Sequence, residues 1–100
     1  MKRILNMLGL CMRAGKIISG EKACVQAVRT GKVCVVLLDG GAAKNAEKAV
    51  TDACSFYEVP LIYAPEHELG DAIGKPGRMV AAITDPSMAD RILELAKAER

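Results

Sequence analysis

The sequence predicts a single α/β domain, a three-layer α/β/α sandwich built around a mixed sheet of about four strands. Segments with apolar residues at helical spacing alternate along the chain with short apolar runs that are typical of strands. The run over residues 33–38 is apolar without interruption, as expected of a strand covered on both faces. A chain of 100 residues, 51% of them hydrophobic, can bury a core without a metal or a disulfide. We therefore assign residues 1–100 to one domain.

In the first half of the chain, helical apolar spacing over residues 4–12 predicts the first helix. A short apolar strand follows at residues 17–18. Ser19 is then in position to cap a second helix, and Gly20 allows another backbone to come close. The second helix presents its apolar face through residues 23–28.

In the second half, the apolar pattern switches between helical and strand spacing several times, and proline marks most of the boundaries. The predicted elements are a helix over 46–57, a strand over 61–63, a short helix over 65–73, a strand over 79–84 and a last helix from Pro86.

Positive charge is concentrated in the first third of the sequence. Seven of the 14 basic residues precede residue 33, where Glu21 is the only acid, although the whole chain carries a net charge of only +2. A cluster of this kind permits nucleic-acid binding, because the local density of charge matters more than the total.

The four cysteines show no Cys-x-x-Cys spacing, and each falls within an apolar pattern. They are predicted to be buried free thiols, which suits a reducing cytoplasm. His67 is the only histidine, so we expect no zinc site and no cofactor. No apolar run approaches about 18 residues and no signal-peptide pattern is present, so we expect a cytoplasmic protein that makes no membrane contact.

The turn from the first strand into the second helix is a candidate phosphate site. The exposed amides and positive dipole of a helix start attract anions, and Lys16 and Lys22 flank this one. The spacing alone favours an ordinary turn with solvated lysines, because the Gly-Lys-Ser/Thr ending of a nucleotide P-loop is missing.

Three segments, residues 13–20, 31–38 and 68–74, together resemble the kink-turn-binding ribosomal protein family, which includes ribosomal proteins seven-Ae and thirty-e. The resemblance covers nearly all of the chain and is nearest to small bacterial members. It implies non-catalytic binding of a sharply bent RNA with a bulge and sheared G·A pairs, in a ribosome or translation context. It also implies ribosomal or other structured RNA as the partner, possible association with the ribosome, and a monomer when free.

The resemblance further implies a contact strip on one side of the second helix and at the strand before the last helix. In it, Gly20 permits close backbone approach, Lys22 faces the G·A pairs, and a splayed base lies beside the end of the last strand. The implied RNA-binding residues are Lys16, Gly20, Lys22, Gln26, Arg29, Lys32, Ile83 and Thr84.

Two positions depart from the family pattern. Ala23 stands where many members carry Glu or Gln, and Gln26 stands where lysine is usual. We therefore expect weaker kink-turn binding or a different RNA shape. Each phosphate contact that is lost should also lower the salt dependence by about one unit.

The same residues also have structural interpretations. Lys22, Gln26 and Arg29 recur at the spacing of any solvated helix face. Ile83 has the character of a core strand residue. The remaining ambiguous positions are Thr84 and Asp85, which could cap the last helix, and Lys75 and Arg78, which could belong to a solvated loop.

Two other function classes compete with RNA binding. A phosphate-handling enzyme could use Asp39 and the glycines after it, at the edge of the sheet where α/β proteins bind ligands. This alternative lacks an acidic pair for Mg²⁺ and a histidine near a nucleophile, so we expect no enzyme. A protein-interaction module acting on ribosomes or translation factors is the other alternative, and it would bind without marked salt dependence.

Aromatic residues make up only 3% of the chain. We expect Phe56, Tyr57 and Tyr63 to lie in or near the core, which would leave no stacking platform for single-stranded RNA.

Overall fold

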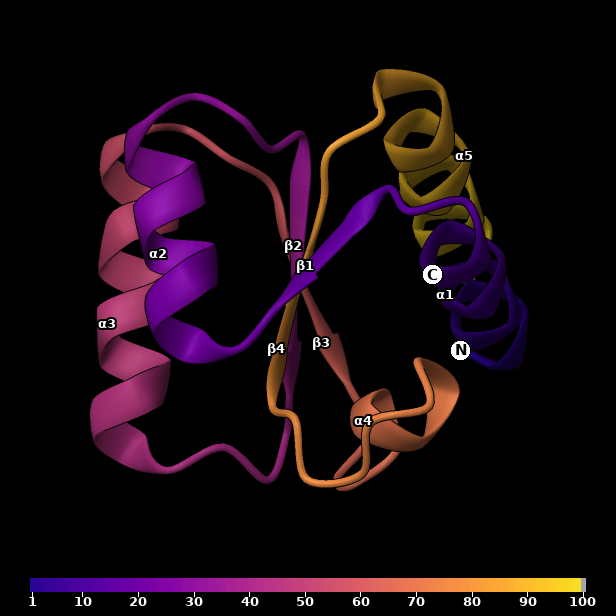
Figure 1. Ribbon diagram of the computed structural model, residues 1–100, viewed down its shortest axis with the longest axis horizontal. Coiled ribbons are helices and arrows are strands. Elements are labelled where there is room, and N and C mark those ends of the chain that lie inside the picture. Colours follow the sequence, from indigo (N-terminus) through magenta and orange to yellow (C-terminus); the bar gives the residue numbers. More distant parts are fainter. Residues whose placement is uncertain (100) are drawn as a thin grey trace.

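The computed structural model, which describes residues 1–99, has helices packed on both faces of a four-stranded sheet (Figure 1). Helices α2 and α3 cover one face, and α1, α4 and α5 cover the other. The elements in chain order are α1 (Lys2–Arg13), β1 (Ile17–Ser19), α2 (Glu21–Arg29), β2 (Val35–Asp39), α3 (Lys44–Phe56), β3 (Leu61–Ala64), α4 (Leu69–Ala72), β4 (Val80–Ile83) and α5 (Pro86–Ala98). The predicted three-layer sandwich with a mixed sheet is confirmed.

Strand β4 lies between β1 and β2 and runs antiparallel to both, whereas β2 and β3 are parallel. Strands β1, β2 and β3 therefore run in the same direction. Their carboxyl ends lie together at one end of the sheet, and their amino ends lie together at the other. We call the edge where these three strands end, at Ser19, Asp39 and Ala64, the carboxyl edge. The opposite edge, where they begin and β4 ends at Ile83, is the amino edge.

The core consists of two clusters of aliphatic and cysteine side chains, one on each face of the sheet. Every residue of β2 is buried, so the predicted covering of both its faces is confirmed. The prediction for the aromatic residues is wrong. Phe56, Tyr57 and Tyr63 are 78%, 45% and 50% exposed, because aliphatic side chains fill the interior and Phe56 falls on the last turn of α3.

Several predicted elements have different limits in the structure. The strand predicted from residue 33 begins at Val35. The helix predicted over 65–73 is reduced to Leu69–Ala72, because residues 66–68 form a turn. The main-chain N–H groups of His67 and Leu69 in this region bond to the Asp39 carboxylate, which holds the turn in place.

The cysteines are free thiols, and Cys11, Cys24 and Cys54 are buried as predicted, whereas Cys34 is only partly buried. Burial raises the pKa of the Cys24 thiol to about 12, so this group stays protonated at neutral pH. Within residues 1–99, the helices are too short or too polar for any of them to cross a membrane.

Candidate nucleic-acid interface

Helix α2 begins at the carboxyl edge with its N-terminus open. Gly20 occupies the N-cap position at φ +100°, and no side chain of residues 1–99 caps the helix. The predicted cap by Ser19 is therefore wrong, because Ser19 is still the last residue of β1. Gly20 donates its N–H to the carbonyl of Val80 at 2.9 Å, which fixes the helix start against β4. The first turn of α2 thus presents the positive end of the helix dipole to an incoming anion.

Arg78 lies directly beside this helix start. Its Nη1 donates to the Ser19 carbonyl at 3.2 Å, and a Cβ built on Gly20 would lie only 2.7 Å from the same nitrogen. Glycine at this position therefore leaves room both for a left-handed backbone and for the guanidinium.

The loop over residues 74–78 brings Arg78 and Lys75 to the carboxyl edge. It packs against Gly70 of α4, where a Cβ would come within 2.6 Å of the Lys75 carbonyl. Lys75 in turn donates its N–H to the Gly70 carbonyl at 2.8 Å. From the sequence alone this loop could not be assigned a role. The signal for its position is Gly70, because the missing Cβ allows the loop to pack closely and to expose Lys75 and Arg78 at the carboxyl edge.

The predicted contact residues divide between the two sheet edges. Gly20 and Lys22 lie at the carboxyl edge, and Lys22, Gln26 and Arg29 form an exposed row along α2. Lys32 is exposed beyond the other end of that helix. Lys16 and Thr84 lie at the amino edge, where the Thr84 N–H donates to the Lys16 carbonyl at 3.0 Å. Gly20 lies four positions after Lys16 along an extended chain, roughly 13 Å away.

Ile83 does not fit the predicted contact strip. It is completely buried in β4, an interior strand of the sheet, and its carbonyl accepts from the Cys34 N–H at 2.8 Å. The structural interpretation of Ile83 as a core residue is therefore the correct one, and we correct the expectation that it lies beside a base. Asp85 caps α5, since its Oδ2 accepts from the Met88 N–H at 2.9 Å.

Asp39, the candidate phosphate acceptor of the enzyme alternative, is buried at the carboxyl edge. Its Oδ1 accepts from the N–H groups of Gly41 and His67 at 2.7 and 2.8 Å, and its Oδ2 accepts from Leu69 at 3.1 Å. Burial would raise the pKa of this carboxyl, but the three backbone donors outweigh it and hold the pKa below its usual range. Both oxygens are thus engaged in fixing the backbone of two loops, which is a structural role.

Residues 2–93 match the ribosomal protein L7Ae/L30e/S12e/Gadd45 family. The chain is 39% identical over 90 residues to RNA-binding protein YlxQ of Bacillus subtilis (strain 168), covering 89% of this chain and 90% of that protein. It is also 39% identical over 95 residues to RNA-binding protein YlxQ of Enterococcus faecium, covering 94% and 91%.

Two solved structures share the fold. A protein with unknown function from Bacillus halodurans C superimposes with a TM-score of 0.89 at 32% identity, over 95% of this chain and 97% of that one. The 15.5kD RNA binding protein of Giardia lamblia superimposes with a TM-score of 0.75 at 22% identity, over 94% and 84%. The family match and the relatives confirm the resemblance found in the sequence, and the chain belongs to the ribosomal protein L7Ae/L30e/S12e/Gadd45 family.

Proposed function

We propose that this protein binds structured RNA, without catalysis, through the carboxyl edge and the exposed row of α2. The open start of α2 carries this proposal. There Gly20 leaves room for the Arg78 guanidinium, no side chain of residues 1–99 caps the helix, and Lys22 and Arg78 add positive charge, with Lys75 in the adjoining loop. The two bacterial relatives whose names describe RNA-binding proteins support the same function.

The geometry suits a distorted duplex better than a regular one. Regular A-form RNA hides its base edges in a deep and narrow major groove, so proteins read bends, bulges and unpaired positions. A helix start flanked by cations can enter a widened groove, where the amides and cations bind phosphates. We therefore propose a kink-turn or a related bent motif as the RNA, in ribosomal RNA or another structured RNA.

Ala23 and Gln26 modify this proposal. Both are exposed on α2 beside Lys22, but neither carries a charge. Recognition of the G·A pairs should therefore depend more on Lys22 and on the 74–78 loop. We propose that the protein acts as a monomer in the cytoplasm, in a ribosome or translation context.

The test is a titration with a labelled kink-turn RNA and with the same duplex after Watson–Crick pairs replace the G·A pairs, each at two salt concentrations. Tight binding to the first RNA alone supports recognition of the bend. Equal and salt-sensitive binding to both would restrict the proposal to general RNA binding. If neither RNA binds, the proposal fails and a protein-interaction module becomes the better explanation.

A further inference from the structure

Helices α2 and α3 lie side by side on one face of the sheet (Figure 1), and a groove follows their boundary. It consists of two hollows of about 320 and 440 Å³. The first contains Lys22 and Gln26, the second contains Phe56, and Arg29 and Ala49 line both. The groove therefore begins at the proposed RNA interface and continues along α2 to the end of α3.

An exposed aromatic pair stands at the far end of this groove. Phe56 and Tyr57 meet edge to face, with ring centroids 4.9 Å apart and ring planes at 74°. Phe56 is 78% exposed, so most of its ring surface is open to solvent. An open ring supported by a second ring can receive a nucleobase, because every base has a face that stacks on an aromatic side chain.

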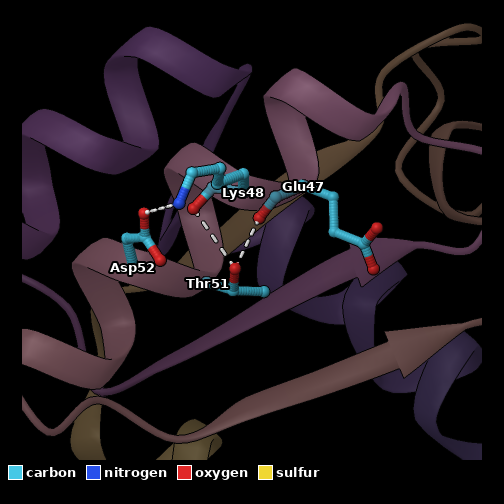
Figure 2. A network of polar contacts seen from close by, with 4 residues as sticks. All are labelled: Glu47, Lys48, Thr51 and Asp52. Atoms are coloured by element: carbon cyan, nitrogen blue, oxygen red, sulfur yellow. Dashed lines mark hydrogen bonds and ion pairs between the residues drawn. The ribbon is translucent and has the colours of Figure 1, made fainter.

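The charges along the groove favour a nucleic-acid strand. Lys22 and Arg29 are exposed on its α2 side, whereas Glu21 stands at the first turn of that helix. The acid on the α3 side, Asp52, accepts from Lys48 Nζ at 3.0 Å (Figure 2). This ion pair offsets the charge of Asp52, which leaves Arg29 free to bind a phosphate beside the aromatic pair.

Glu47 does not add negative charge to this boundary. Figure 2 shows its carboxylate pointing away from Lys48, Thr51 and Asp52. One of its oxygens accepts from the hydroxyl of Tyr63, on β3, at 2.9 Å. An arginine next to an open ring is the combination that holds a phosphate and the adjacent base of a single strand.

We infer that the α2–α3 groove binds a single-stranded extension of the RNA held at the carboxyl edge, with one unpaired base stacked on Phe56 and a phosphate on Arg29. This inference rests on the proposed function. The groove is continuous with the start of α2, because Lys22 and Arg29 are only about 10 Å apart along the helix. This continuity with the proposed RNA interface favours RNA over a protein partner.

The first experiment compares a blunt kink-turn RNA with the same RNA carrying a short adenosine extension at its 3′ or 5′ end. The extension should tighten binding to the unaltered protein by about tenfold. Phe56→Ala should lose this gain and keep its affinity for the blunt RNA, whereas Phe56→Tyr should keep the gain. Leu10→Ala is the matched control, because Leu10 is also an exposed apolar residue but lies on α1, across the sheet.

A second measurement locates the base directly. The chain contains no tryptophan, so Phe56→Trp introduces a single indole whose fluorescence a stacked base should quench. Quenching by the extended RNA, but not by the blunt RNA, supports stacking at this position. Leu10→Trp should respond to neither RNA.

The outcomes separate the two proposals. If both RNAs bind the unaltered protein equally, or if Phe56→Ala retains the gain from the extension, the groove does not hold the strand and a protein partner becomes its better occupant. If neither RNA binds, the proposed function fails and this inference fails with it.

Discussion

Helices α2 and α5 both start next to the sheet, but at opposite edges, and within residues 1–99 only the N-terminus of α5 has a side-chain cap. Helix α5 begins at the amino edge with Pro86 in its first turn, and Asp85 caps it with its own carboxylate. Helix α2 begins at the carboxyl edge behind Gly20, with no side-chain cap within the described chain. The Asp85 carboxylate therefore already bonds to an amide at the start of α5. Helix α2 has Glu21 in its first turn, but within residues 1–99 no side chain bonds to its first amides, so these are left for an external anion. The comparison teaches that the start of α5 is closed to an external anion by its own cap, whereas the uncapped start of α2 can receive one.

The largest expected effect concerns the support of the carboxyl edge. Asp39→Asn replaces an acceptor-only carboxylate with a group that has one acceptor oxygen for three buried N–H donors. We expect the free energy of unfolding to fall by about 2 kcal/mol, measured by urea denaturation at neutral pH. An unchanged value would mean that the Asp39 bonds do not hold this edge.

The same carboxylate predicts how stability depends on pH. Because the folded protein holds the pKa of Asp39 below its usual range, Asp39 contributes stability above the unfolded pKa of about 4. That contribution should disappear as the pH falls through the folded pKa. Between pH 5 and strong acid, the unaltered protein should therefore lose its stability advantage over Asp39→Asn, and parallel curves would contradict this.

The next largest effect is the difference in RNA affinity between alanine substitutions at two glycines. Gly20 and Gly15 both have positive φ, +100° and +70°, but only Gly20 has a neighbour within 4 Å of an added Cβ. Replacement by Ala should strain either backbone by about 1 kcal/mol. Gly20→Ala should also weaken RNA binding by at least about tenfold, since the added Cβ would displace the Arg78 guanidinium from its place beside the helix start. Equal affinities of the two variants would show that RNA does not reach the start of α2.

A smaller effect on RNA affinity should distinguish the lysine at the carboxyl edge from the lysine at the amino edge. Lys22→Ala should weaken RNA binding several-fold and reduce the slope of log affinity against log salt by about one unit. Lys16→Ala, which removes the same charge at the amino edge, should change the slope less. A larger change for Lys16 would extend the interface to the amino edge.

The smallest effect on RNA binding is expected at the capped helix. Asp85→Ala removes the hydrogen bond to the Met88 N–H and should lower the free energy of unfolding by about 1 kcal/mol. The affinity for RNA, measured below the unfolding transition, should not change. If Asp85→Ala weakens RNA binding, the amino edge takes part in recognition after all.

Local sequence patterns predicted most of the elements but not the site. Apolar spacing located the helices, and the uninterrupted run around Val35–Asp39 indicated a strand buried on both faces. The site depends on how β4 pairs with β1, with Ser19 opposite Ala81 and Ile17 opposite Ile83. This pairing connects residues more than sixty positions apart, and no local pattern encodes it.

Two errors follow from this missing information. Without the pairing, Thr84 could be placed beside Gly20, whereas it lies with Lys16 at the other edge. The exposure of Phe56 also could not be predicted, because it depends on where the last turn of α3 ends relative to α2. Local periodicity reports which face of an element is apolar, but not which neighbour covers it.

The position of β4 also has a consequence for the order of folding during synthesis. This strand is the last of the sheet in the chain, yet it lies between β1 and β2 and is the partner to which β1 bonds. Until residues 80–83 emerge, β1 has no strand beside it, and Gly20 lacks the Val80 carbonyl that fixes the start of α2. Closing this long loop comes late, because distant contacts cost the most chain entropy. We therefore expect a nascent chain that ends before β4 to be unable to bind RNA at the start of α2, although the residues proposed there have already been made.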